Sequence, residues 1–227
     1  MKKMLTFLCL AAGAVAAADE LQGYYRDPDP ARAQQVFAGF AADSKLRQKG
    51  SARLYTTIWG AQILRDAPAH VADWCQAAAG YDAGAREVAA ELFYFVNSPE
   101  SLACLKDLDI PAEKKDDMLA NPFALQGDWV DLPVHGAQDI DIAWTVFYAS
   151  GKPAAVHKIV DFMVAEEEKV REVAKSGEER VSLDQQAAIW STKSNMKQDD
   201  RIAGIVRDYV ATLPEGKRAI AEELLNK

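Results

Sequence analysis

The sequence has little of several residue types on which familiar functions depend. It contains three histidines and three cysteines in 227 residues, which argues against a histidine-rich metal site and a disulfide-dense miniprotein. Basic residues number 26 against 34 acidic ones, and the net charge of −8 makes generic binding to a phosphate backbone improbable. At 49% hydrophobic and 26% charged residues, the composition is that of an ordinary globular protein rather than a disordered or fibrous one.

Sequence motifs for several kinds of chemistry are also missing. The chain has no GxSxG or HExxH motif, no P-loop and no GxGxxG, so neither these catalytic centres nor a nucleotide site is indicated. In the acidic run 166–168, Lys169 follows Glu166 by three residues and Arg171 follows Glu167 by four. This spacing is typical of ion pairs on a solvated helix face rather than of a catalytic carboxylate pair.

One short segment holds the residues from which an unrecognised reaction centre could be built. Asp128, Asp131, His135 and Asp139 are residue types that act as general acids and bases or as metal ligands. Their spacing matches no zinc motif, and Asp139 is better interpreted as a helix cap. We therefore expect no metal, no cofactor and no enzymatic activity, and we keep an exported hydrolase using these four residues as the rival hypothesis.

Residues 1–18, MKKMLTFLCLAAGAVAAA, have the pattern of a secretory signal peptide. Lys2 and Lys3 form a positive start, and the apolar stretch 5–15 is too short to span a bilayer as a stable helix. The small residues at its end predict cleavage after Ala18, and hence a periplasmic or secreted protein. No later stretch approaches 18 consecutive apolar residues, so we expect no transmembrane segment in the mature protein.

Two cysteines remain after such cleavage, because Cys9 lies within the signal peptide. In an oxidising compartment Cys75 and Cys104 are predicted to form a disulfide, with two buried free thiols as the alternative. A link that closes a loop of this size stabilises the fold by about 3–4 kcal/mol in the chain-entropy model.

The apolar spacing predicts an all-α fold. Ile202, Ile205, Val206 and Tyr209 recur at the spacing of one helix face, and no convincing set of alternating strands is present. Helix-start signals agree with this interpretation, since an N-cap residue precedes a proline at 29–30 and again at 98–99. The expected helices are 30–43, 51–66, 68–79, 84–97, 99–107, 111–120, 139–150, 153–175, 182–194, 199–212 and 214–226.

A weak internal repeat suggests how these helices are organised. Three helix–proline–helix units align on Pro68, Pro99 and Pro153, each with an apolar residue at matching offsets. Such hairpins must stack to bury their apolar faces, so we predict an irregular, solenoid-like stack of helical hairpins. A globular helical bundle is the alternative. In the stacked arrangement Cys75 and Cys104 lie on equivalent helices of neighbouring units.

We predict a single α-helical domain over residues 19–227. It consists of an N-terminal half, 19–121, a connector, 122–138, and a C-terminal half, 139–227. The connector contains prolines and glycines but no helical period, and loops of this length in compact domains usually have a functional or packing reason.

The connector and the tryptophans supply the candidate binding residues. Phe123, Trp129 and His135 are our candidates for a binding loop, although a packed connector explains them as well. The five tryptophans, Trp190 included, are expected in the core; two or more exposed together would mark a binding surface. The polar stretch 191–195 favours a helix end followed by a turn.

These observations favour a non-enzymatic, exported protein that binds another protein or a peptide in the cell envelope. The acidic composition favours a basic partner, and an inhibitor or immunity-type protein that neutralises a toxic enzyme is an attractive special case. A structural envelope protein is a third hypothesis, beside the hydrolase.

Overall fold

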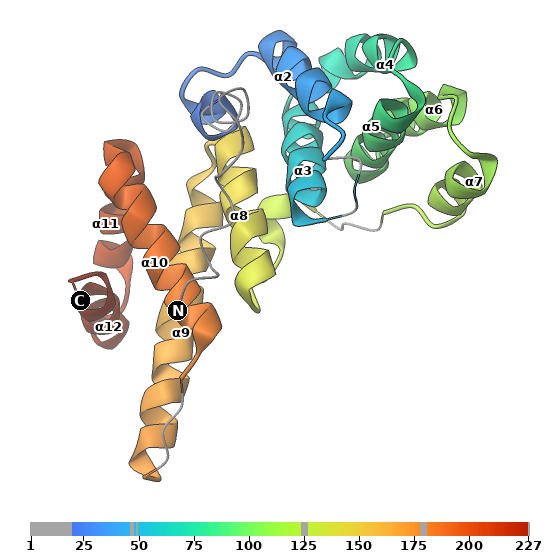
Figure 1. Ribbon diagram of the computed structural model, residues 1–227. Helices are drawn as coiled ribbons and strands as arrows, with labels where there is room; N and C mark the ends of the chain where they lie inside the picture. Colours follow the sequence, from blue (N-terminus) through green and yellow to red (C-terminus); the bar gives the residue numbers. More distant parts are fainter. Residues whose placement is uncertain (1–19, 46–47, 49, 124–126, 178–180, 227) are drawn as a thin grey trace. The chain divides into compact units, whose positions relative to one another are not determined.

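The structure, a computed structural model, confirms the all-α class (Figure 1). It describes residues 20–45, 48, 50–123, 127–177 and 181–226. The predicted signal peptide, residues 1–18, lies outside the described residues. Contacts divide the chain into two compact units. Unit 1 runs to Gly127 and includes Tyr148–Gly151; unit 2 comprises Asp128–Phe147 and Lys152–Lys227.

Unit 1 is built from short helices joined by tight turns. Its elements are η1 (Tyr24–Arg26), α2 (Pro30–Ala42), α3 (Ser51–Asp66), η2 (Pro68–His70), α4 (Val71–Ala79), α5 (Ala83–Val96), α6 (Pro99–Asp107) and α7 (Ala112–Ala120). The expected caps are present: the Asp29 carboxylate accepts from two backbone N–H groups of α2, and Ser98 forms a capping box with Ser101.

The two hairpins of unit 1 pack with equivalent helices side by side. The first helices, α3 and α5, pack against each other, and so do the second helices, α4 and α6. Cys75 on α4 and Cys104 on α6 form the predicted disulfide, with their Cα atoms 5.8 Å apart. The stacking of these two hairpins agrees with the alignment on Pro68 and Pro99, while a longer solenoid-like array stays a prediction.

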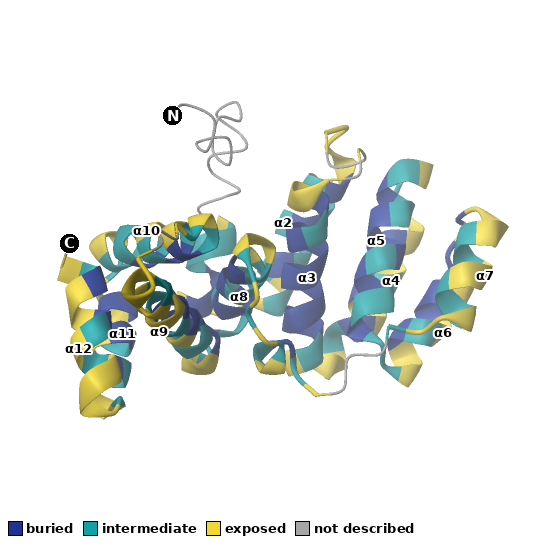
Figure 2. Ribbon diagram, turned by 90° about the horizontal axis from the view of Figure 1, so that it is seen from below, coloured by how far each residue is buried: buried dark blue, intermediate teal, exposed yellow. Residues whose placement is uncertain are grey.

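Helix α3 packs against α2 and α5 in unit 1 and is almost entirely buried (Figure 2). Gly60 allows it to approach α5 closely, since a Cβ there would lie 2.5 Å from Leu92 Cδ1. At one end of α3, Arg53 forms a bidentate ion pair with Glu91 of α5, at 2.6 and 2.7 Å. Lys114 of α7 also contacts Glu91, at 2.9 Å, so a charged network joins three helices.

Unit 2 is organised around one long helix. Its elements are η3 (Trp129–Asp131), α8 (Ala137–Ser150, of which Tyr148–Ser150 belong to unit 1), α9 (Pro153–Lys175), α10 (Leu183–Gln198), α11 (Asp200–Thr212) and α12 (Glu215–Asn226). Helices α10, α11 and α12 all pack against α9. None of the described helices is both long and apolar enough to cross a lipid bilayer.

Helix α10 begins where the sequence predicts but continues further. The Ser182 hydroxyl accepts from the Gln185 backbone N–H, while the Gln185 amide donates to Glu167 of α9 at 2.8 Å. The expected helix end at 194 and the turn before Asp199 are wrong, because the helix runs on to Gln198. Ser191 bonds back to the Ala188 carbonyl, so its hydroxyl is satisfied inside the helix instead of ending it.

Candidate functional site

The structure places the three candidate residues of the connector in different surroundings. Phe123 belongs to unit 1, where its half-buried ring packs against Tyr94 and Phe95 with centroids 5.8 and 5.0 Å apart. Trp129 belongs to unit 2 and is buried in η3. His135, also in unit 2, is exposed. Within unit 2, therefore, His135 is the candidate residue that is free to meet a partner.

The aspartates of the rival hydrolase hypothesis take part in local structure. Asp131 accepts from the Asp128 backbone N–H at 3.1 Å, and Asp139 accepts from the His135 backbone N–H at 2.8 Å. Asp128 pairs with Lys152. Among the described residues, no three histidine, cysteine or acidic side chains gather into a set that could hold a metal ion.

An open groove of about 330 Å³ lies between the connector and α9 in unit 2. Pro133, Val134 and His135 form one wall. The other wall is one side of α9, with Lys158, Asp161, Phe162, Ala165, Glu166 and Lys169. Three consecutive residues of the predicted connector thus line a surface depression, which the sequence left open as one of two interpretations.

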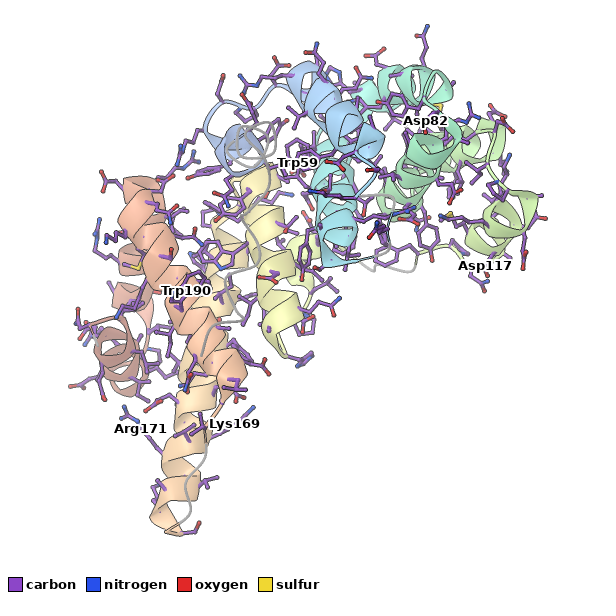
Figure 3. The ribbon with its side chains drawn as sticks, in the orientation of Figure 1. Trp59, Asp82, Asp117, Lys169, Arg171 and Trp190 are labelled. Atoms are coloured by element: carbon purple, nitrogen blue, oxygen red, sulfur yellow. A yellow bond between two sulfur atoms is a disulfide. The ribbon has the colours of Figure 1, made fainter. Side chains whose placement is uncertain are left out.

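The charged side chains of this groove are engaged within the fold. Lys158 donates to the Leu132 carbonyl at 3.2 Å, and Lys169, labelled on α9 in Figure 3, pairs with Glu166 at 2.6 Å. Asp161 accepts from the Tyr209 hydroxyl at 2.8 Å. A ligand in the groove would have to compete with these contacts, so the groove offers few ready polar partners.

An aromatic stack lies beside the groove and joins α9 to α11. The His157 and Tyr209 rings are parallel, with centroids 3.9 Å apart. Burial lowers the pKa of His157 below its ordinary value, although Asp161 opposes part of this shift. Burial, reinforced by the hydrogen bond to Asp161, raises the pKa of Tyr209 to about 12. The neutral forms of both rings are therefore favoured in the folded protein.

The largest exposed apolar side chains cluster elsewhere in unit 2, at α10. Among the residues that the structure describes, the large hydrophobic side chains that are exposed are Val181, Leu183 and Trp190, at 69%, 71% and 62% of their full surface. All three lie within ten residues of sequence, and Figure 3 labels Trp190 on α10. Singly scattered exposed apolar residues are normal, whereas a contiguous exposed apolar patch is a feature of interaction sites. Val181 precedes α10, and Leu183 and Trp190 lie on the helix two turns apart.

The prediction that Trp190 packs in the core is wrong, and the helix geometry explains why. Helix α10 buries Gln185, Ala188 and Thr192, which share one face. Trp190 and Leu183 lie on the opposite side of the helix. The usual amphipathic arrangement is weakened in α10, since its fully buried residues are small or polar and Leu183 and Trp190 are exposed, while Ile189 and Met196 are half-buried. The other four tryptophans, Trp59, Trp74, Trp129 and Trp144, are buried as expected.

We define the outer face of α10 as the residues opposite its buried side: Leu183, Gln186, Ala187, Trp190, Lys193, Ser194 and Lys197. Leu183, Trp190 and Lys197 are seven residues apart and so form a nearly straight line about 20 Å long. Lys193 and Lys197 make no ion pair with any described residue. This face therefore combines unpaired cations with exposed apolar surface.

Ser194 and Lys197 also have the SxxK spacing of some serine–lysine catalytic pairs. In α10 the Ser194 hydroxyl accepts from the Gln198 amide at 3.0 Å. No hydrogen bond joins Ser194 to Lys197 in the described part of the chain, so the geometry gives no sign of an activated nucleophile.

Comparisons with known proteins found no matching family model, curated protein or solved structure. The function must therefore be argued from the surfaces of this chain alone.

Proposed function

We propose that this protein is an exported, non-enzymatic helical protein that binds another protein in the cell envelope through the outer face of α10. The observation that carries this proposal is the clustering of the exposed large apolar side chains at Val181, Leu183 and Trp190. Export rests on the signal-like sequence of residues 1–18.

The magnitude of the exposed surface supports a binding role. A tryptophan exposed to 62% presents on the order of 150 Å² of surface. At about 25 cal/mol per Å², covering it stabilises a complex by about 4 kcal/mol before the entropic cost of association. Tryptophan is also enriched among the residues that dominate binding energies at protein interfaces.

The packing of α10 supports the same proposal. Exposing Trp190 has a cost in solubility that an ordinary surface helix avoids with polar residues, and the fold buries Thr192 and Gln185 instead. A surface helix normally exposes polar residues, and a helix that instead exposes large apolar ones is expected at a functional site. An inhibitor that neutralises a toxic enzyme remains the special case that this proposal accommodates.

Photo-crosslinking in the organism that produces the protein tests the proposal. A benzophenone amino acid is placed at Gln186, on the outer face of α10, and as a matched control at Glu222, which is exposed on α12. We expect an adduct with a defined protein from position 186 that is absent from position 222 and lost in the Trp190→Ala variant. Identical adducts from both positions, or none from position 186, would contradict the proposal.

The inhibitor special case has its own readout. If the crosslinked protein is an enzyme, equimolar addition of the purified protein should lower its activity, and the Trp190→Ala variant should not. An adduct whose partner keeps full activity leaves binding intact but removes inhibition.

A further inference from the structure

The local charge of the outer face of α10 differs in sign from that of the whole chain. The chain carries 34 acidic residues and a net charge of −8. Yet the seven residues of this face include Lys193 and Lys197 and no carboxylate. A partner that contacts this face meets two positive charges beside an apolar surface.

Several of the described lysines pair with carboxylates inside the fold. Lys114 pairs with Glu87 and Glu91, and Lys169 pairs with Glu166. The ammonium groups of Lys193 and Lys197 have no such carboxylate among the described residues, so their charge remains available to a partner.

Distance decides which charges matter at an interface. The Debye length is about 8 Å at physiological ionic strength, so the negative charges of remote helices are largely screened at this face. Of the two carboxylates just beyond Lys197, Asp199 caps the N-terminus of α11 and Asp200 is exposed in its first turn. Lys197 lies about 10 Å from Trp190 along the helix, and Lys193 lies one turn from it. Local complementarity at these lysines, rather than net charge, therefore sets the partner's preferred chemistry.

We infer that the partner is a protein whose contact surface is an apolar pocket bordered on one side by carboxylates; this inference rests on the proposed function. The pocket receives Trp190 and Leu183. The carboxylates lie toward the C-terminal end of α10, where they meet Lys193 and Lys197. The preference is thus for an acidic contact surface, opposite to the basic partner that the overall composition favours.

A peptide selection tests the inference without knowledge of the natural partner. A displayed library of random 16-residue peptides is selected on the immobilised full chain, with an excess of soluble Trp190→Ala variant as competitor. Three purified proteins are then titrated with the enriched peptides: the wild type, the K193E/K197E variant and the K106E/K217E variant. The last is a matched control, because it makes the same charge change at exposed lysines of α6 and α12.

We expect the enriched peptides to combine a large apolar residue with neighbouring aspartate or glutamate. Their affinity should fall at least tenfold in K193E/K197E and less than twofold in K106E/K217E, and it should weaken as salt is added. Peptides that depend on Trp190 but show no acidic preference and no loss in K193E/K197E would overturn the inference while the proposed function stands. Failure to enrich any Trp190-dependent peptide would count against both.

A lipid surface is the competing occupant, because exposed tryptophan and lysine also favour membrane interfaces. Co-sedimentation with vesicles of equal parts phosphatidylglycerol and phosphatidylcholine distinguishes it. We expect no Trp190-dependent binding to these vesicles. Vesicle binding that disappears in the Trp190→Ala variant would overturn the assignment of a protein partner.

Discussion

Trp144 on α8 donates a hydrogen bond from its indole Nε1 to the Ser191 hydroxyl on α10, at 3.1 Å. Consecutive residues of a helix point about 100° apart, so turning Ser191 toward Trp144 turns its neighbour Trp190 away. The buried tryptophan thus helps to fix the orientation in which the exposed one is presented. One indole is buried in the core and the other is exposed to solvent.

The two tryptophans should respond differently to truncation. Trp190→Ala should change the free energy of unfolding by less than about 0.5 kcal/mol, because the side chain is largely solvated. Trp144→Ala should cost about 3–5 kcal/mol, because it leaves a cavity in the core and removes the hydrogen bond to Ser191. Urea unfolding followed by circular dichroism measures both. A large loss in Trp190→Ala would mean that the indole is packed in the fold.

Much of the fold could be predicted from the sequence because helix formation and capping are local. The period of Ile202, Val206 and Tyr209 and the caps at Asp29 and Ser98 depend on residues within one or two turns. The disulfide followed from two cysteines and an expected oxidising compartment. The connector was harder, because a stretch without a period does not say which of its residues touch a helix distant in sequence.

The outer face of α10 could not be predicted because this helix does not direct its largest apolar residue toward the core. A periodicity argument assigns the largest apolar residue to the core, and Trp190 is on the other side. The sequence carries a weak indication of the buried face, because Gln185, Ala188 and Thr192 also recur at helical spacing. Only the packing against α8 and α9 selects between the two faces.

Gly60 should be intolerant of even a methyl group. In Gly60→Ala the new Cβ would lie 2.5 Å from Leu92, which is fully buried and cannot swing into solvent. Overpacking should outweigh the better helix propensity of alanine and destabilise the protein by about 1–2 kcal/mol.

Gly39→Ala is the matched control for this substitution. It adds the same methyl group in α2, where nothing lies within 4 Å, and should stabilise the protein by about 0.5–1 kcal/mol. Thermal unfolding of both variants gives the comparison. Equal shifts in the same direction would show that α3 and α5 are not in close contact at Gly60.

The disulfide should contribute substantially to the stability of unit 1. Cys75 and Cys104 are 29 residues apart in sequence, and replacing both by serine should lower the unfolding free energy by about 3–4 kcal/mol. Reduction of the wild-type protein should give a similar loss. A change below about 1 kcal/mol in denaturant unfolding would show that the link constrains the unfolded chain little.

Stability should decrease as the pH falls through the range in which His157 titrates. Because burial lowers the pKa of His157 in the folded protein, the unfolded chain binds more protons near and below pH 6.5. The unfolding free energy contributed by this residue is therefore fully present above pH 6.5 and declines as the pH is lowered.

His157→Phe keeps an aromatic ring on Tyr209 but cannot titrate. Urea unfolding of the wild type and this variant is measured from pH 8 to pH 5. We expect the free energy of unfolding of the wild type to fall relative to that of the variant as the pH is lowered. A constant difference, or one of opposite sign, would contradict the burial of a neutral histidine in this stack.

The most direct test of α10 as the binding surface is the affinity of the crosslinked partner for wild type and for Trp190→Ala, measured by titration calorimetry at one salt concentration. We predict at least a 30-fold weaker affinity in the variant, with unchanged circular dichroism, since residues that dominate an interface contribute about 2 kcal/mol or more. An affinity within twofold of the wild type would show that the exposed indole does not hold the partner.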